Sequence, residues 1–168
     1  MRYLRSTSLI VLALAGCVAP PQAPESPPAP VVTPAPRPTP APLPLAVDWS
    51  DWPFTPGDWQ YRSQPGATMA SFGAGLLSVR CDRSSRQIIL GGLANAPTTI
   101  RTTSMTKSIT VTPDRAATGS IATFAANDPL LDALAFSRGR FVIEQNGQPP
   151  LVLPPHAEIG RVIEDCRG

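Results

Sequence analysis

The sequence predicts an α+β domain, a strand-rich antiparallel sandwich or open barrel with two short helices. Several short runs alternate apolar and polar residues, which is the period of a strand with one buried face. Two later segments, after Asn127 and after Pro155, carry apolar residues at helical spacing instead. About 120 residues from Ala46 onward are enough for one modest core. We therefore expect a single globular domain over residues 46–168.

The predicted strands begin at a loop rich in tryptophan and proline and continue almost to the end of the chain. They are Trp59–Ser63, Ala67–Phe72, Leu76–Cys81, Arg86–Leu90, Thr98–Ser104, Ser108–Thr112, Gly119–Phe124, Arg140–Gln145 and Leu151–Leu153. Polar residues 82–85 predict a tight hairpin between the third and fourth of these. Asn146-Gly147 is a strong signal for a hairpin that joins the last two.

Both helices have recognisable starts. Asn127 or Asp128 can cap the first helix, Pro129 suits its first turn, and Gly139 follows its end. Its apolar face comprises Leu130, Leu131, Leu134 and Ala135. The second helix, 156–166, has an apolar face made of Ile159, Val162, Ile163 and Cys166. These two faces are expected to cover one side of the sheets.

The chain before the domain has a different composition. Twelve of the 22 prolines lie between Pro20 and Pro44. Proline lacks an N–H group and fixes φ, so residues 17–45 are predicted to be a disordered, polyproline-like linker of about 3.1 Å per residue. Such a stalk would act as a tether that holds the domain at a distance from the start of the chain. Two alternatives are a ligand for a proline-recognising partner and a thread through the peptidoglycan mesh.

Charge excludes one class of partner. The whole chain carries a formal charge of +2, but the segment from Ala46 onward has equal numbers of basic and acidic residues. A nucleic-acid-binding domain normally carries a basic patch or stripe. We therefore expect no nucleic-acid partner.

The first sixteen residues have the three parts of a secretory signal peptide. Arg2 and Arg5 precede the apolar run Ser8–Ala15, which is shorter than the roughly 20 residues of a membrane-spanning helix. The following Leu14-Ala15-Gly16-Cys17 resembles the lipobox of bacterial lipoproteins at every position. The alternative is an ordinary cleaved signal followed by an incidental cysteine.

The lipobox resemblance implies a lipid-anchored chain with the membrane as its partner. In that family the cysteine, here Cys17, receives diacylglycerol, the chain is cleaved after Gly16, and the new amine is acylated. Two or three acyl chains anchor a protein stably, because each buried CH₂ contributes about 0.8 kcal/mol. Val18 after the cysteine, rather than Asp, implies the outer membrane, with the domain facing the periplasm.

Cys81 and Cys166 are then the two remaining cysteines. Exported proteins fold in an oxidising compartment, where two such cysteines usually pair, so a structural disulfide is expected. It would join the end of a strand to the end of the last helix. A metal-binding pair or a redox centre is the alternative, although the chain contains no Cys-x-x-Cys sequence.

The sequence offers little to support catalysis. His156 is the only histidine, no Gly-x-Ser-x-Gly occurs, and one histidine with two paired cysteines cannot complete a zinc site. Gly73-Ala74-Gly75 lacks the lysine and the spacing of a phosphate-binding loop. We therefore expect no enzyme activity, no catalytic residue, no metal and no cofactor.

Five residues are candidates for binding a partner. Trp49, Trp52 and Trp59 lie within eleven residues, and such a cluster serves either as a carbohydrate platform or as a lid on the core. Arg101 and Lys107 belong to the hydroxyl-rich run Thr99–Lys107, which could bind an anionic ligand or a glycan, or simply form an exposed strand face. The expected partner is peptidoglycan or another envelope protein.

Two further resemblances concern the domain itself. The segments Ser137-Arg138-Gly139-Arg140-Phe141 and Arg161-Val162-Ile163-Glu164-Asp165-Cys166-Arg167 resemble those of uncharacterised lipoproteins from sphingomonad-type Alphaproteobacteria. The order of elements is loosely similar to invasion-associated locus B proteins. Neither resemblance implies an activity.

Val79-Arg80-Cys81-Asp82 resembles the Tyr-x-Cys-Asp start of lipoprotein inhibitors of lysozyme, with Val in place of Tyr. This last resemblance implies inhibition of a lysozyme-type enzyme as an alternative to a binding or structural role. The chain departs from that family in its helical ending.

Overall fold

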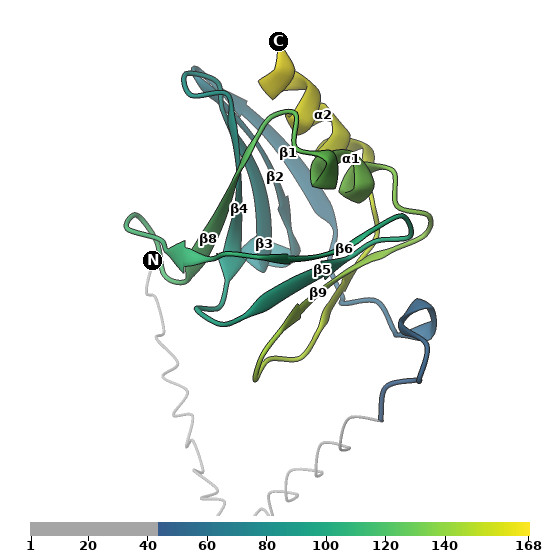
Figure 1. Ribbon diagram of the computed structural model, residues 1–168. Helices are drawn as coiled ribbons and strands as arrows, with labels where there is room; N and C mark the ends of the chain where they lie inside the picture. Colours follow the sequence, from purple (N-terminus) through teal and green to yellow (C-terminus); the bar gives the residue numbers. More distant parts are fainter. Residues whose placement is uncertain (1–43) are drawn as a thin grey trace, which may run out of the picture. The chain divides into compact units, whose positions relative to one another are not determined.

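Alternating apolar and polar residues build two antiparallel sheets, which a computed structural model describes for residues 44–168 (Figure 1). The predicted signal peptide, Cys17 and nearly all of the proline-rich linker lie outside the described residues. The prediction of a strand-rich α+β fold with two helices is confirmed. The larger sheet, sheet A, has six strands, and the smaller, sheet B, has four.

Sheet A is a meander of four strands extended by two later ones. In spatial order its strands are β1 (Trp59–Gln64), β2 (Ala67–Phe72), β3 (Leu77–Asp82), β4 (Gln87–Leu93), β8 (Ser120–Ala125) and β7 (Thr112–Pro113). Residues Ala70, Val79 and Leu90 lie side by side across β2, β3 and β4 and are all buried. The inward face is therefore continuous across the meander.

Sheet B is assembled from two hairpins that are far apart in sequence. Its strands, in spatial order, are β10 (Leu151–Leu153), β9 (Phe141–Gln145), β5 (Thr98–Arg101) and β6 (Thr106–Ile109). The predicted Asn146-Gly147 turn joins β9 to β10, and Gly147 has φ +77°, which glycine adopts readily. Ile100 and Ile143, paired in register, face the core.

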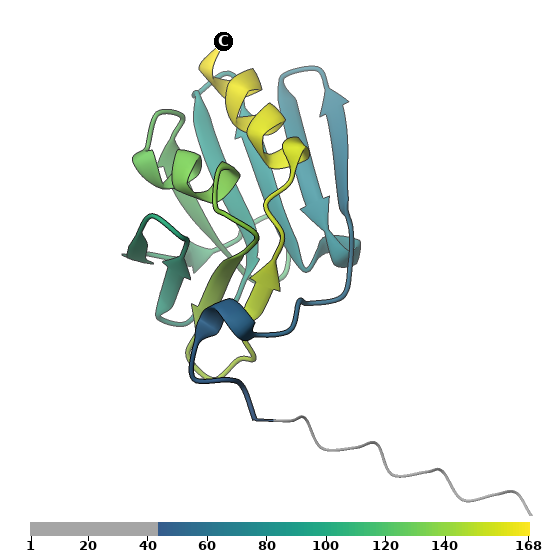
Figure 2. The same ribbon diagram turned by 90° about the vertical axis from the view of Figure 1, so that its right-hand side faces the viewer.

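The helices lie on the inward side of sheet A (Figure 2). Helix α1 (Pro129–Ala135) begins as predicted, since the Asp128 side chain accepts a hydrogen bond of 2.8 Å from the Leu130 N–H. Helix α2 (Ala157–Arg167) runs across β1 to β4. Two short 3-10 turns, η1 (Trp49–Asp51) and η2 (Gly73–Gly75), complete the elements.

Helix α2 closes the core through the face predicted from its spacing. Its buried side chains are Ile159, Val162, Ile163 and Cys166. They join a cluster that includes Phe72, Leu77 and Phe141 from the two sheets. Full burial of an aliphatic or aromatic side chain contributes about 1.5–3 kcal/mol, so this face accounts for much of the attachment of α2.

A second, smaller apolar contact lies on the outer side of sheet B. Val142 and Val152 are almost fully buried, yet their register places them opposite to the main core. The segment that precedes β1 crosses this side, and Thr55 exchanges hydrogen bonds of 2.9 and 3.0 Å with the backbone of Val152. In both views η1 lies beside β9 and β10 (Figures 1 and 2).

One pair of predicted strands differs from the structure. The predicted strand Thr98–Ser104 ends at Arg101, because the Thr102 hydroxyl accepts hydrogen bonds from the Ser104 and Met105 N–H groups and closes a turn. The predicted Ser108–Thr112 is divided between β6 in sheet B and β7 in sheet A. This stretch of chain thus crosses from one sheet to the other.

A substitution at Gly92 tests the close approach of β4 to the backbone of Leu76. It has φ +88° at the irregular step between Gly91 and Leu93, and an added Cβ would lie 2.4 Å from the Leu76 carbonyl oxygen. We predict that Gly92→Ala lowers the unfolding free energy of the full chain by about 1–3 kcal/mol. Denaturant titration without reductant measures this change.

Gly160 provides the matched control, because it lies inside α2 and no atom would meet its added Cβ within 4 Å. Gly160→Ala should raise the unfolding free energy by up to about 1 kcal/mol, the difference in helix propensity. Equal effects of the two substitutions would contradict the packing described around Gly92.

Candidate functional site

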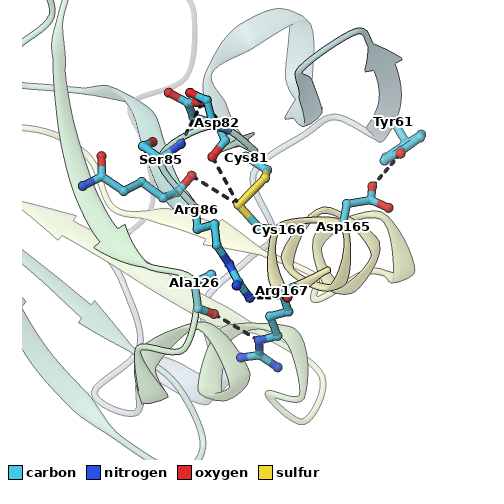
Figure 3. The surroundings of a disulfide bond; sticks show 11 residues. Tyr61, Cys81, Asp82, Ser85, Arg86, Ala126, Asp165, Cys166 and Arg167 are labelled. Atoms are coloured by element: carbon cyan, nitrogen blue, oxygen red, sulfur yellow. Dashed lines mark hydrogen bonds between the residues drawn. A yellow bond between two sulfur atoms is a disulfide. The ribbon is translucent and has the colours of Figure 1, made fainter.

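The two cysteines of the domain meet at the C-terminal end of α2 (Figure 3). Cys81 in β3 and Cys166 in α2 are both buried, and their Cα atoms lie 5.5 Å apart. The Cys166 sulfur also lies 3.4 Å from the Gln87 carbonyl oxygen, a non-bonded contact, because a disulfide sulfur carries no hydrogen. The predicted disulfide is therefore present, and it joins residues 85 positions apart.

Polar contacts around the disulfide hold both sides of α2. The Tyr61 hydroxyl on β1 donates a 2.7 Å hydrogen bond to Asp165 (Figure 3). The Arg161 guanidinium lies 4.1 Å from the centre of the Tyr61 ring. Arg167 donates to the Ala126 carbonyl at 3.0 Å. The end of α2 is thus tied to the sheet edge on one side and to the α1 region on the other.

The β3–β4 turn beside the disulfide is held by its own side chains. Asp82 accepts hydrogen bonds from the Ser84 N–H at 3.0 Å and the Ser84 hydroxyl at 2.7 Å. These bonds, with one from Ser85, lower the pKa of the Asp82 carboxyl below its ordinary value. The predicted polar turn thus has a definite conformation.

The three tryptophans lie in different surroundings. Trp59 is only 8% exposed, packs against Phe72 with ring centres 5.3 Å apart, and donates its indole N–H to the Pro154 carbonyl at 2.9 Å. It therefore occupies the position of a lid on the core. Trp49 is half-buried in η1. Trp52 is also half-buried, and its indole N–H donates to the Ala46 carbonyl at 2.7 Å.

Trp52 lines a pocket of about 240 Å³ on the outer side of sheet B. The other lining residues are Leu45, Glu144, Gln145, Gln148 and Pro150. The Gln145 amide is already bonded to Ala94 and to the Thr98 hydroxyl. Gln148 is exposed, and its side chain has no hydrogen bond to any residue between 44 and 168.

Arg101 belongs to the same region through Glu144. Its Nε and Nη2 donate to one carboxylate oxygen of Glu144, Oε2, at 3.1 and 2.8 Å. Both side chains are about one third exposed, so the pair contributes at most about 1 kcal/mol to stability. Its second effect is to orient the carboxylate, whose other oxygen, Oε1, accepts no hydrogen bond from the described residues.

Lys107 lies apart from Arg101. Register pairs Ile100 with Lys107 and Arg101 with Thr106, so the two basic residues are on opposite faces of sheet B. The Lys107 ammonium lies 3.1 Å from Asp128, the residue that caps α1. Of the five predicted binding residues, Trp52 lines the pocket and Arg101 is connected to it through Glu144. Trp49, Trp59 and Lys107 do not line this pocket.

Sequence reasoning missed the residues that complete this pocket. Glu144 is the only charged residue of β9, where it follows three apolar residues and precedes Gln145, and Gln148 lies between β9 and β10. A charged residue in a strand that otherwise looks buried indicates that its side chain either reaches solvent or is paired with a specific partner. That partner, Arg101, is 43 residues away in sequence, so only the pairing of β5 with β9 identifies it.

Other features of the described region can be stated briefly. Between residues 44 and 168, no helix has the length and apolar character needed to span a membrane. The same residues contain no group of three or more His, Cys, Asp or Glu side chains placed to hold a metal ion. His156 contacts Glu158, and this hydrogen bond lowers the pKa of the Glu158 carboxyl.

The disulfide offers a direct test of stability. Closing a loop of 85 residues contributes about 4–5 kcal/mol in the chain-entropy account. We predict that the double variant Cys81→Ala/Cys166→Ala of the full chain loses a free energy of unfolding of this order. Denaturant titration measures the loss, and reductant should lower the stability of the natural chain but not that of the variant.

Thiol titration of the unfolded chain provides the control. In a Cys17→Ser background, no thiol should react before reduction and two should react after it. Two reactive thiols in protein that was never reduced would contradict the bond.

Comparison with known proteins adds no relative: the chain matches no protein-family model, no curated protein sequence and no solved structure.

Proposed function

We propose that this chain is a lipid-anchored envelope lipoprotein whose domain is a non-catalytic binding module for a cell-wall or protein partner. The Cys81–Cys166 disulfide carries this proposal, because such bonds persist in oxidising compartments such as the periplasm. The chain has three cysteines, and the third, Cys17, is the last residue of the lipobox-like sequence. One cysteine is thus available for lipid and two for stability.

The anchoring step follows the chemistry of the lipoprotein family that the leader resembles. The Cys17 sulfur forms a thioether with diacylglycerol, and its proton leaves with the displaced lipid head group. Water then hydrolyses the Gly16–Cys17 peptide bond. The freed amine of Cys17 accepts an acyl group from an ester of a membrane lipid, whose alcohol leaves with the amine proton. By the family rule for Val18, the proposed location is the outer membrane, with the domain facing the periplasm.

The Trp52 pocket is the proposed place where the partner binds. An indole ring offers a flat apolar surface, while the oriented Glu144 carboxylate and the Gln148 amide offer hydrogen-bonding groups beside it. A glycan has both apolar C–H faces and hydroxyl or amide groups, so this combination suits the peptidoglycan of the cell wall.

Mass spectrometry of protein from native membranes tests the anchor. We expect the mature chain to begin at Cys17 and to carry the added mass of diacylglycerol and of one further acyl chain. Cys17→Ser should remove the lipid mass and release the protein from the membrane. A mature chain that begins elsewhere, or an unmodified Cys17, would contradict the proposal.

Co-sedimentation with purified peptidoglycan tests the binding site. We predict that Trp52→Ala weakens sedimentation of the full chain about tenfold, as expected for the loss of one aromatic contact. Gln148→Ala should weaken it about threefold to tenfold, as expected for the loss of one hydrogen bond between neutral groups. Phe136→Ala is the matched control, because Phe136 is 77% exposed and does not line the pocket.

The binding result separates the possible partners. Equal sedimentation of all variants would exclude the pocket as the peptidoglycan site. If the natural chain does not sediment but crosslinks through the Trp52 region to an envelope protein, the partner is a protein.

Inhibition of a lysozyme-type enzyme is the second candidate. The observation that favours it is the bond between a strand-borne cysteine, Cys81, and a cysteine near the end of the domain, Cys166, as in the inhibitors that Val79-Arg80-Cys81-Asp82 resembles. A lysozyme activity assay with micromolar full chain decides this question. Undiminished activity excludes the inhibitor function.

A further inference from the structure

The outer face of sheet A carries a row of residues that the proposed function does not use. Both helices lie on the inward face of this sheet (Figure 2), so no helix of residues 44–168 covers the outer face. Register aligns Arg62 on β1, Met69 on β2, Arg80 on β3 and Ile89 on β4 in one row across the strands. Two arginines therefore flank a single methionine.

Neither arginine is neutralised by the part of the chain that the structure describes. Within residues 44–168, Arg62 and Arg80 form no ion pair and no side-chain hydrogen bond, whereas Arg101 and Arg167 are paired with carboxylates. A small hollow of about 60 Å³ lies between them. Its lining residues are Arg62, Gln64, Ala67, Thr68, Met69 and Arg80.

The spacing allows both guanidinium groups to reach one ligand. Strands β1 and β3 are separated by β2, so the two Cα atoms lie about 10 Å apart across the sheet. Each arginine side chain has to cover only about half of that distance to meet the other above Met69. Gln64 adds an amide donor at the rim of the hollow.

We propose that Arg62 and Arg80 form a phosphate-binding site above Met69 on the outer face of sheet A. A phosphate group carries a charge of about −1.5 to −2 and three acceptor oxygens, so it balances two guanidinium groups and bonds to both. A carboxylate, with one charge and two oxygens, is already satisfied by one arginine. The ligand is therefore a molecule with a terminal phosphate, such as a phosphorylated glycan or a lipid head group.

Asp82 is the one acidic residue in β1 to β4, and it forms no ion pair with either arginine among the described residues. Asp82 follows Arg80 on the same face by two residues, and its register partner is Ala67. Its oxygen Oδ1 accepts bonds from Ser84 and Ser85 in the β3–β4 turn. Asp82 is thus engaged by the turn and forms no ion pair with Arg62 or Arg80 among the described residues.

This site is independent of the Trp52 pocket, because it lies on the other sheet and on residues that the pocket does not share. A phosphate-bearing ligand here and a glycan at Trp52 could bind at the same time. The two proposals can therefore fail separately.

Methyl NMR of the full chain, purified in an uncharged detergent, tests the proposal with inorganic phosphate as the probe. Methionine labelled with ¹³C in its methyl group places one reporter, Met69, in the hollow and another, Met105, at the β5–β6 turn. Phosphate should shift the Met69 signal saturably at constant ionic strength and leave Met105 unchanged. Acetate should bind at least tenfold more weakly.

Matched substitutions distinguish a built site from general attraction. Arg62→Gln and Arg80→Gln should each weaken phosphate binding about tenfold, and the double variant should abolish the Met69 shift. Arg83→Gln/Arg115→Gln removes the same charge from exposed positions outside the hollow and should bind normally.

Three results would overturn the proposal: no shift of the Met69 signal with phosphate, an equal shift with acetate, or an equal loss of the phosphate-induced shift in both double variants. To identify the source of the phosphate, the natural chain is then titrated with glucose 6-phosphate and with a short-chain phosphatidic acid. A larger Met69 response to the first supports a phosphorylated glycan, and a larger response to the second supports a lipid head group.

Discussion

The attachment of α2 to sheet A is the constraint on which the rest of the domain depends. The inward face of β1 to β4 is mostly apolar, and α2 covers it with one face of four buried side chains. The Cys81–Cys166 bond fixes the far end of that helix, and Tyr61 and Arg167 secure its sides. Without this cover the apolar side chains on the inward face of sheet A would be exposed to water.

The same arrangement determines which surfaces remain free to bind other molecules. With its inward face under α2, sheet A presents only its outer face, where Arg62 and Arg80 lie. Sheet B is partly covered on its outer side by the segment before β1, and the Trp52 pocket forms where that covering meets Glu144. The candidate surface on sheet A thus follows from how that sheet is covered. The Trp52 pocket also depends on loops, because four of its six lining residues lie before β1 or between β9 and β10.

Local sequence patterns predicted most of the helices and strands, but they could not predict contacts between residues that are far apart in the sequence. The alternation of Leu77, Val79 and Cys81 and the helical spacing of Ile159, Val162 and Cys166 are local signals, and each corresponds to an observed element. The association of Arg101 with Glu144 requires the β5–β9 pairing, which no local pattern contains. The turn at Thr102 depends on one side-chain hydroxyl, which the alternation of residues does not indicate. The position of β6 after that turn, and its separation from β7, therefore could not be predicted from the pattern either.

Hydrogen exchange of the oxidised and the reduced chain tests the central claim most directly. If the disulfide holds α2 on the sheet, reduction should accelerate exchange of the α2 amides first, while the amides of β2, β3 and β4 stay protected by their ladder. Peptide-resolved mass spectrometry separates these regions. Equal protection of α2 before and after reduction would contradict the account.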